Sequence, residues 1–467
     1  MTEQAFLLPF ITPSEQPAMR RFAVLAILLI TSASRIQADV KLPAVLDSHM
    51  VIQRDRPVRI WGTADPGEAV SVTLGSETKK TTAGDDSRWL VELSAQKADG
   101  KPRQISIAGK NEIVLNDILV GEVWIGSGQS NMEWRLNSTH GSKEAIAAAS
   151  HPNIRLFHVP KVRKPAPADD VQAAWKVCSP ETIPTFSAVL YYFGAELQKE
   201  LKVPIGLINS SWGGSPIEPW TIKGKSSGAM YNGMIAPLTN VSVRGAIWYQ
   251  GETNVLNKNG LSYADKMKDL IEGWRTAFQN PDLAFHFVQI APWSGRYEPG
   301  QLPALWEAQA ASLKIPNTGM AVTTDLVDNI ADIHPRNKRD VGHRLSLWAL
   351  TKNYGRKGLV YSGPLYTGMS VEGGSIRLKF AHTGEGLKSS DGKPLTEFRI
   401  AGESGDFVDA EATVDGHTVV LRAESVSKPA RVQFGWHKTA QPNLVNSAGL
   451  PASPFQTVNW RGGTGIE

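Results

Sequence analysis

Between about residues 116 and 355 the chain alternates between apolar strand-like runs and amphipathic helical segments, and this alternation restricts its possible folds more than any other feature. In the helical segments apolar residues recur with a period near 3.6, whereas the runs between them have the short apolar pattern of buried strands. Such alternation predicts an α/β domain with a mainly parallel sheet, whose functional residues gather at the carboxyl ends of the strands. The expected strands are VGEVWIG (120–126), PIGLINSS (204–211), RGAIWYQG (244–251), AFHFVQIA (284–291) and GMAVTTD (319–325), and the expected helices include SAVLYYFGAELQKEL (187–201) and YADKMKDLIEGWRTAF (263–278).

The segments on either side of this region have a different pattern: short runs in which apolar and polar residues alternate, separated by turn sequences such as DPGE, GDDS and ADGK. Regularly spaced short strands of this kind are typical of small β-sandwiches. We therefore predict an N-terminal β module over 39–115, the α/β domain over 116–355 and a C-terminal β module over 356–467. The expected module strands lie within 57–64, 68–75, 88–95, 103–109, 375–382, 397–403, 407–424 and 430–437.

The N-terminal segment predicts export. Arg20 and Arg21 precede an apolar run over 22–30, and a small-residue exit follows at Ala38. This is the pattern of a secretory signal peptide, expected over 1–38 with Met19 as an alternative start. The apolar run is short for a membrane span, so no stable membrane insertion is expected.

Charge and cysteine content exclude several classes of protein. The formal net charge is +4, and no dense Lys/Arg cluster marks a nucleic-acid surface. Cys178 is the single cysteine, so an intramolecular disulfide is impossible, and we expect a buried structural thiol. No Cys/His cluster has the spacing of a zinc site. Neither a metal nor an organic cofactor is expected. The sequence does not indicate an oligomeric state.

Four polar segments follow or approach predicted strand ends. In GSGQSNMEW (126–134), Ser130 sits in a glycine-containing turn, where serine serves either as a nucleophile or as a helix N-cap. In SSWGGSPIEPW (210–220), Gly213 and Gly214 permit either an oxyanion hole or a plain turn. The first turn lacks the G-x-S-x-G pattern, which disfavours an ordinary α/β-hydrolase.

The other two segments supply amides, a carboxylate and a histidine. Gln250, Glu252 and Asn254 lie in YQGETN, and amide side chains of this kind either donate to an oxyanion or complete a turn. Asp332 and His334 lie in DIHP, and a histidine oriented by a carboxylate is the base that a nucleophilic serine requires. Together the four segments contain every part needed for acyl transfer.

These segments also resemble a known family. GQSNM, SSWGGSPIEPW, YQGETN and DIHP resemble the conserved blocks of SGNH-type esterases, and more closely those of the sialate O-acetylesterase-like carbohydrate acetylesterases. LPAVLDSHMVIQRDRPVRIWGTADPGE (42–68) and NLVNSAGLPASPFQT (443–457) resemble the two ends of that family, so the resemblance covers most of residues 40–458. It implies a three-layer SGNH-hydrolase-like domain flanked by small β modules.

The resemblance implies a role for each motif residue. Ser130 would be the nucleophile, His334 the base and Asp332 its orienting acid. SGNH enzymes commonly place the acid three residues before the histidine, where this chain has Ala331, so Asp328 and Asp325 remain alternatives for that role. The expected oxyanion donors are the N–H groups of Ser130 and of Gly213 or Gly214, with a side-chain amide from Gln250 or, second, Asn254; Gln129, Glu252 and Trp212 are expected at the substrate site, and Glu252 alternatively braces the turn.

The function implied is that of a secreted serine esterase that removes O-acetyl groups from carbohydrate, with a sialate as the first candidate substrate. An acetylxylan or other polysaccharide acetylesterase is the alternative within the hydrolases. A noncatalytic carbohydrate-binding protein on an esterase scaffold is the alternative of another class. Because Ser130 and His334 are both present, the sequence favours the enzyme.

Overall fold

The structure is a computed structural model that describes residues 39–224 and 226–458. The predicted signal peptide, 1–38, and the last nine residues of the predicted C-terminal module, 459–467, lie outside this part of the chain. Within it, every helix is too short or too polar to cross a membrane.

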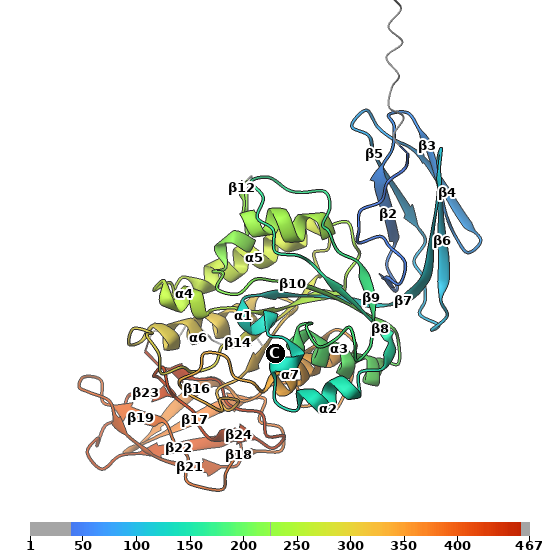
Figure 1. The fold of residues 1–467 in the computed structure, drawn as a ribbon. Helices are drawn as coiled ribbons and strands as arrows, with labels where there is room; N and C mark the ends of the chain where they lie inside the picture. Colours follow the sequence, from blue (N-terminus) through green and yellow to red (C-terminus); the bar gives the residue numbers. More distant parts are fainter. Residues whose placement is uncertain (1–38, 225, 459–467) are drawn as a thin grey trace, which may run out of the picture. The chain divides into compact units, whose positions relative to one another are not determined.

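A central sheet of mainly parallel strands forms the middle of the α/β region (Figure 1). Its order is β15-β14-β13-β7-β10-β8-β9, and only the edge strand β9 runs antiparallel to its neighbour. The five strands predicted from the sequence are all present, whereas β8 and β9 were not predicted. The bounds are β7 Glu112–Gly128, β8 His151–His158, β9 Trp175–Cys178, β10 Ile205–Ser211, β13 Gly245–Tyr249, β14 Ala284–Gln289 and β15 Thr318–Val322.

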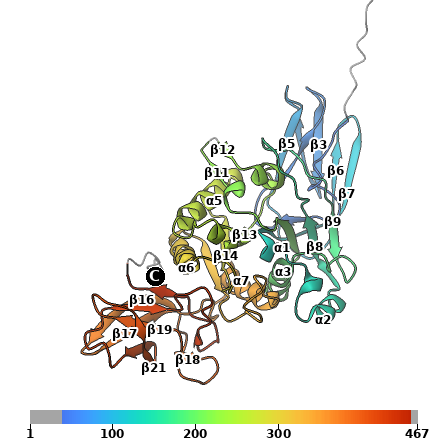
Figure 2. The ribbon, with the colours of Figure 1, turned by 60° about the vertical axis from the view of Figure 1, so that its left-hand side comes forward.

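Helices cover both faces of this sheet (Figures 1 and 2). On one face α3 packs against α7, and Phe193 of α3 meets the Trp124 ring of β7 at a centroid distance of 5.0 Å. On the other face Trp274 of α5 contacts Trp248 of β13 at 6.4 Å. The predicted three-layer α/β fold is therefore confirmed. The helices are α1 Ser130–Glu133, α2 Ser142–Ala147, α3 Ala188–Leu201, α4 Glu252–Leu256, α5 Tyr263–Ala277, α6 Gln301–Ala311 and α7 Lys338–Lys352, and a small hairpin joins β11 Ile222–Lys223 to β12 Ser226–Ser227.

Local sequence explains the limits of α3 and α7, the two helices that pack together on one face of the sheet. The Ser187 hydroxyl caps α3 by accepting a hydrogen bond from the Leu190 N–H at 3.2 Å, and Lys202 ends this helix in the left-handed region at φ 56°. The Asn337 side chain caps α7 by accepting from the Asp340 N–H at 3.1 Å. Polar caps thus set where each helix starts.

Two small antiparallel sheets precede the α/β region, one pairing β2 with β5 and the other containing β4, β3, β6 and the first part of β7. All four strands predicted within 57–109 are present, but the boundary predicted at 115/116 falls inside β7, a single strand of 17 residues. Because β7 continues into the central sheet, module and α/β region share one apolar core. The module strands are β1 Val51–Gln53, β2 Val58–Thr63, β3 Ala69–Leu74, β4 Glu77–Thr82, β5 Arg88–Leu93 and β6 Arg103–Ala108.

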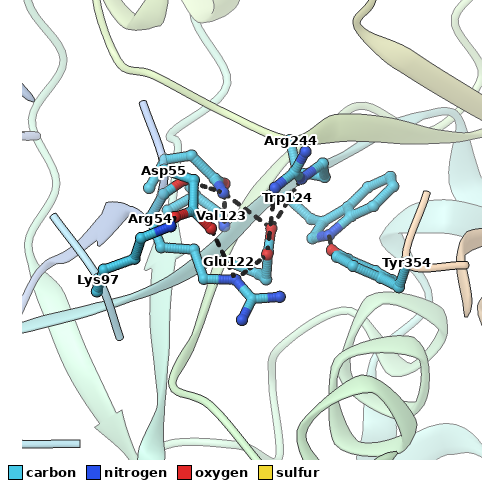
Figure 3. A network of polar contacts seen from close by, with 9 residues as sticks. Arg54, Asp55, Lys97, Glu122, Val123, Trp124, Arg244 and Tyr354 are labelled. Atoms are coloured by element: carbon cyan, nitrogen blue, oxygen red, sulfur yellow. Dashed lines mark hydrogen bonds and ion pairs between the residues drawn. The ribbon is translucent and has the colours of Figure 1, made fainter. Parts of the chain in front are cut away.

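A buried ion cluster lies where β7 passes from one region to the other (Figure 3). The Glu122 carboxylate is fully buried and accepts from the Arg54 Nε at 2.5 Å and from the Arg244 Nε at 3.0 Å. The buried Gln53 amide also donates to Glu122, at 2.8 Å. Arg54 follows β1 and Arg244 precedes β13, so one carboxylate joins three segments far apart in the sequence.

The C-terminal region consists of small antiparallel sheets with an apolar cluster of their own. Strands occur in each of the four segments predicted within 375–437. The Lys438 ammonium donates to the carbonyls of Gly295 and Tyr297 at 2.6 and 3.0 Å, which fixes the loop after β14. The strands are β16 Leu365–Glu372, β17 Ser375–Ala381, β18 Leu387–Ser389, β19 Phe398–Ala401, β20 Val408–Asp409, β21 Glu411–Asp415, β22 Thr418–Arg422, β23 Arg431–Phe434, β24 Leu444–Asn446 and β25 Phe455–Gln456.

Cys178 confirms the prediction of a buried structural thiol. It ends β9 with 1% of its surface exposed, and burial raises the pKa of the thiol to about 12. Since the thiolate is the reactive form, this residue is poorly suited to act as a nucleophile.

Candidate active site

Three of the four polar segments meet where β10, β7 and β13 end side by side. Gly128, the last residue of β7, is in register with Ser211 of β10 and with Tyr249 of β13. The turns that follow these strands therefore start at one edge of the sheet. The segments with Ser130, Gly213 and Gln250 are brought together by this register, as expected for the carboxyl ends of parallel strands.

Gly128 gives Ser130 its position. Its φ is +132°, and a Cβ built there would lie 2.2 Å from the Tyr249 carbonyl oxygen, so only glycine fits. The next N–H, that of Gln129, donates to the same oxygen at 3.0 Å. The chain is thereby bound to β13 immediately before Ser130, which begins the short helix α1.

Ser130 and His334 face each other at hydrogen-bonding distance, although 204 residues separate them. The Ser130 Oγ lies 2.9 Å from the His334 Nε2, and both side chains are partly buried. The indole of Trp134 stacks on the imidazole at a centroid distance of 4.7 Å and an angle of 20°. Burial, reinforced by the positive charge of Lys338, lowers the pKa of His334, so the imidazole is kept neutral and able to accept a proton.

Among the three candidate acids, Asp332 is the one beside His334. Its Oδ1 accepts from the His334 backbone N–H at 2.9 Å and lies 3.5 Å from Nδ1. Asp328 instead contacts the Nε2 of His140 at 2.7 Å, and Asp325 forms a two-pronged pair with Arg344 at 2.7 and 2.6 Å. The geometry thus supports Asp332 over the two alternatives.

The loop that carries Asp332 and His334 is held from the preceding side. The Trp293 indole N–H donates to the Ala331 carbonyl at 3.0 Å, and the Ser294 N–H donates to the Ile330 carbonyl at 2.8 Å. Trp293 also donates its backbone N–H to the carbonyl of Lys438, at 2.8 Å. The C-terminal region therefore contacts the segment that supports the histidine.

Gly213 lies directly against Ser130, since a Cβ built on it would stand 3.4 Å from the Ser130 Cβ. Its N–H donates to the Glu133 carboxylate at 2.6 Å, and the other oxygen of that carboxylate pairs with Lys161 at 2.5 Å. Gly214 has a φ of +75°. An oxyanion role for the Gly213 N–H stays a prediction, and it requires Glu133 to give up this hydrogen bond.

Gln250 and Asn254 are fully buried and hydrogen bonded within the protein. The Gln250 amide N–H groups lie within reach of Gln129 Oε1 at 3.0 Å, Asn254 Oδ1 at 2.8 Å and the Ser215 carbonyl at 3.2 Å. The Asn254 amide N–H groups face the Glu218 carboxylate. An oxyanion role for either amide stays a prediction that needs an exchange of partners when substrate binds.

The residues expected to contact substrate differ in how much of their surface is exposed to solvent. Gln129 and Glu252 are buried, with 3% and 2% of their surfaces exposed. Glu252 accepts from the Asn131 amide at 2.5 Å, which fits its alternative role as a brace. Trp212 is partly buried, and the Arg163 guanidinium lies 5.1 Å from the centre of its ring.

Sequence reasoning did not identify two further residues at this site, Asn131 and Lys338. Asn131 follows the serine in the GQSNM segment and is 1% exposed. Lys338 is the first residue of α7, four residues after His334, and it is fully buried. A lysine at the start of a helix gives no sequence pattern that would predict this burial. Only the tertiary structure brings the two together.

A three-layer α/β fold with a paired serine and histidine at the carboxyl edge of its sheet is the arrangement typical of serine hydrolases. Residues 120–350 match the model of a family described as carbohydrate esterase, sialic acid-specific acetylesterase. The chain is 32% identical over 384 residues to human sialate O-acetylesterase, covering 70% of this chain and 73% of the human protein. It is 31% identical over 433 residues to the rat sialate O-acetylesterase, covering 74% and 80%.

A solved structure agrees with these relatives. The crystal structure of a carbohydrate acetylesterase from Xanthomonas citri has a TM-score of 0.86 and 37% identity, covering 90% of this chain and all of that one. The chain belongs to the sialic acid-specific acetylesterase family of carbohydrate esterases, and it is a carboxylic ester hydrolase.

Proposed function

We propose that this protein removes O-acetyl groups from carbohydrate through an acetyl-serine intermediate on Ser130. The observation that carries the proposal is the 2.9 Å contact between Ser130 Oγ and His334 Nε2 where three parallel strands end. A serine becomes nucleophilic when a neutral base accepts its proton, and burial keeps His334 neutral by lowering its pKa.

The reaction then follows from the positions of these groups. Ser130 Oγ attacks the acetyl carbonyl carbon, and its proton passes to His334 Nε2. The tetrahedral intermediate breaks its bond to the sugar oxygen, which leaves with the proton from His334. Water attacks the acetyl-serine with His334 again as base, so acetate is released and the Ser130 hydroxyl is restored.

Backbone donors next to Ser130 suit the negative charge that develops on the carbonyl oxygen. The Ser130 N–H opens α1, and the first N–H groups of a helix have no partner within it. The other predicted donors are the N–H of Gly213 or Gly214 and a side-chain amide, that of Gln250 or, second, Asn254. Each such donor typically lowers the barrier by about 3 kcal/mol.

The named relatives favour an O-acetylated sialate as substrate, and an acetylated xylan is the second candidate. The test is acetate release by the purified protein from O-acetylated sialic acid, from acetylated xylan and from a small aryl acetate. We expect release from the aryl acetate and from the sialate, with kcat/KM on the sialate at least about tenfold above that on xylan, a difference of about 1.4 kcal/mol. A preference for xylan would reverse the substrate assignment, and binding without any release would favour the noncatalytic alternative.

Asp332 is proposed to hold His334 in its reactive orientation. In Asp332→Asn we expect kcat to fall about tenfold, since the contact to Nδ1 is 3.5 Å long and partly exposed. The acid limb of the kcat/KM profile should move to lower pH, because the Asp332 charge raises the pKa of His334. Both quantities are read from pH–rate profiles on the aryl acetate.

Asp328→Asn is the matched control for this variant. Its carboxylate pairs with His140 and not with His334, so we expect activity within about twofold of the unchanged protein. Equal losses in the two variants would argue against Asp332 as the acid.

Export remains part of the proposal. It rests on the predicted signal peptide with cleavage after Ala38.

A further inference from the structure

A chain of buried polar contacts, centred on Asn131, lies next to the Ser130–His334 pair. The Lys338 ammonium donates to the Asn131 Oδ1 at 2.5 Å. The Asn131 amide nitrogen donates to Glu252 Oε1 at 2.5 Å and to the Ile333 carbonyl at 3.1 Å. Asn131 adjoins Ser130 and Ile333 adjoins His334, so this one amide connects the two catalytic segments.

The partners of Asn131 permit a single orientation of its amide. An ammonium can only donate, so it requires the amide oxygen. A carbonyl and a carboxylate oxygen require the amide nitrogen. Without Lys338, the amide oxygen would lose its buried donor, although Glu252 and Ile333 would still accept from the amide nitrogen.

Lys338 occupies a position that is unfavourable for a cation on two counts. It is fully buried, and it is the first residue of α7, where the helix dipole is positive. Burial lowers the pKa of Lys338 to about 7, against the opposing influence of Glu252, Asp332 and Asp328. A costly buried charge that contacts the active site is more typical of function than of stability.

We propose that Lys338 and Asn131 are positioning residues of the esterase: the buried ammonium anchors the oxygen of the Asn131 amide, and the amide holds the nucleophile segment and the histidine segment together. This inference rests on the proposed function of Ser130 and His334. The ammonium also lies 5.2 Å from the centre of the Tyr249 ring and 5.9 Å from that of Trp134, the indole that stacks on His334. Lys338 therefore lies against the ring that stacks on the imidazole, in addition to its contact with Asn131.

The same ammonium influences the proton affinity of the base. The charged groups that act on Lys338 are Glu252 of α4 and the loop residues Asp332 and Asp328. Those that act on His334 are Lys338, which lowers its pKa, and Asp332, which raises it. Removing the Lys338 charge should move the acid limb of kcat/KM to higher pH, opposite in direction to the effect of Asp332→Asn.

The test uses Lys338→Met and Asn131→Asp in the full chain, with an aryl acetate as substrate. Methionine keeps the length of the side chain without its charge, and we expect kcat to fall about tenfold with little change in KM. Aspartate keeps the shape of asparagine but cannot donate to Ile333 or Glu252, and we expect a loss of about 100-fold. Circular dichroism measures the folded fraction of each variant, and rates are expressed per folded molecule.

Lys352→Met is the matched control, because Lys352 lies in the last turn of the same helix and contacts a ring, that of Tyr361, at 5.1 Å. It should keep activity within about twofold and an unchanged acid limb. If folded Lys338→Met has unchanged kcat and an unchanged acid limb, the inference is overturned. Should Lys338→Met fail to fold, unchanged kcat in folded Asn131→Asp overturns it instead.

Labelling of Ser130 by a fluorophosphonate separates this inference from the proposed function. If the unchanged protein hydrolyses no acetate ester but labels at Ser130, the proposed function fails, and slower labelling of Lys338→Met still supports the positioning role. Equal labelling rates in the two proteins would contradict it.

Discussion

Replacing Ser130 with alanine is expected to lower kcat for acetate release by about 10⁴-fold or more while the fold is retained. Removing the nucleophile of a serine hydrolase leaves only what the remaining donors and substrate binding provide. Ser130 Oγ contacts the His334 Nε2, and the side chain is partly exposed at the edge of the sheet, so its loss leaves no large cavity. The measurement is steady-state acetate release, with thermal unfolding recorded alongside.

Ser127→Ala is the matched control for this prediction. Ser127 lies on β7 three residues before Ser130, and its buried hydroxyl has no hydrogen-bond partner among the described residues. Alanine there removes an unsatisfied polar group, so both activity and stability should be kept. Retained turnover in Ser130→Ala would exclude this residue as the nucleophile, whereas loss in both variants would indicate general damage to β7.

Ser130 could be predicted because it stands next to a strand end that the sequence reveals, whereas His334 was assigned from the Asp-x-His spacing of DIHP and from the family resemblance. Ser130 follows the apolar run at 120–126, and an apolar run in a parallel sheet brings its following turn to the functional edge. The side-chain amides expected to donate to the oxyanion were harder to predict from the sequence. Gln250 and Asn254 were predicted from their place after a strand-like run and from the family resemblance, and only tertiary contacts show that both amides already have protein partners.

The Asn131–Lys338 contact is a clearer example of what sequence pattern leaves out. Lysine is almost never fully buried, so its placement beneath the site contradicts the expectation for its residue type. Departures of this kind are expected where function, not stability, selects the residue. Residue type and spacing alone do not reveal them.

The fold was predicted where periodicity is strong and missed where it is weak. β4 reads ETKKTT and is mostly exposed, so it lacks an apolar alternation that would mark it as a strand. β8 begins with HPN, and proline within a run argues against a strand interior. The boundary placed at 115/116 assumed that a change in texture marks a domain edge, but β7 continues through it because one strand serves two sheets.

Glu122 lies on β7, the strand that runs through both sheets, and we expect its buried carboxylate to contribute strongly to stability. Replacing Glu122 with alanine should lower the free energy of unfolding by about 3–5 kcal/mol, because it leaves the guanidinium groups of Arg54 and Arg244 without their carboxylate. Arg54 and Arg244 are both mostly buried, with 23% of each side chain exposed, so water compensates little. The measurement is urea-induced unfolding followed by tryptophan fluorescence, since Trp124 lies two residues away on β7.

Glu92→Gln tests whether the lower free energy of unfolding expected for Glu122→Ala comes from the burial of its ion pairs or would follow the loss of any ion pair. Glu92 pairs with Arg59 at 3.3 Å, but half of its side chain is exposed, so the loss should stay below about 1 kcal/mol. In folded Glu122→Ala the esterase activity should be kept, because the six residue steps of strand from Glu122 to Gly128 place the turn that carries Ser130 roughly 20 Å from this cluster. If Glu122→Ala unfolds at the same urea concentration as the unchanged protein, the two arginines have found other partners. The ion cluster around Glu122 would then contribute little to the free energy of unfolding.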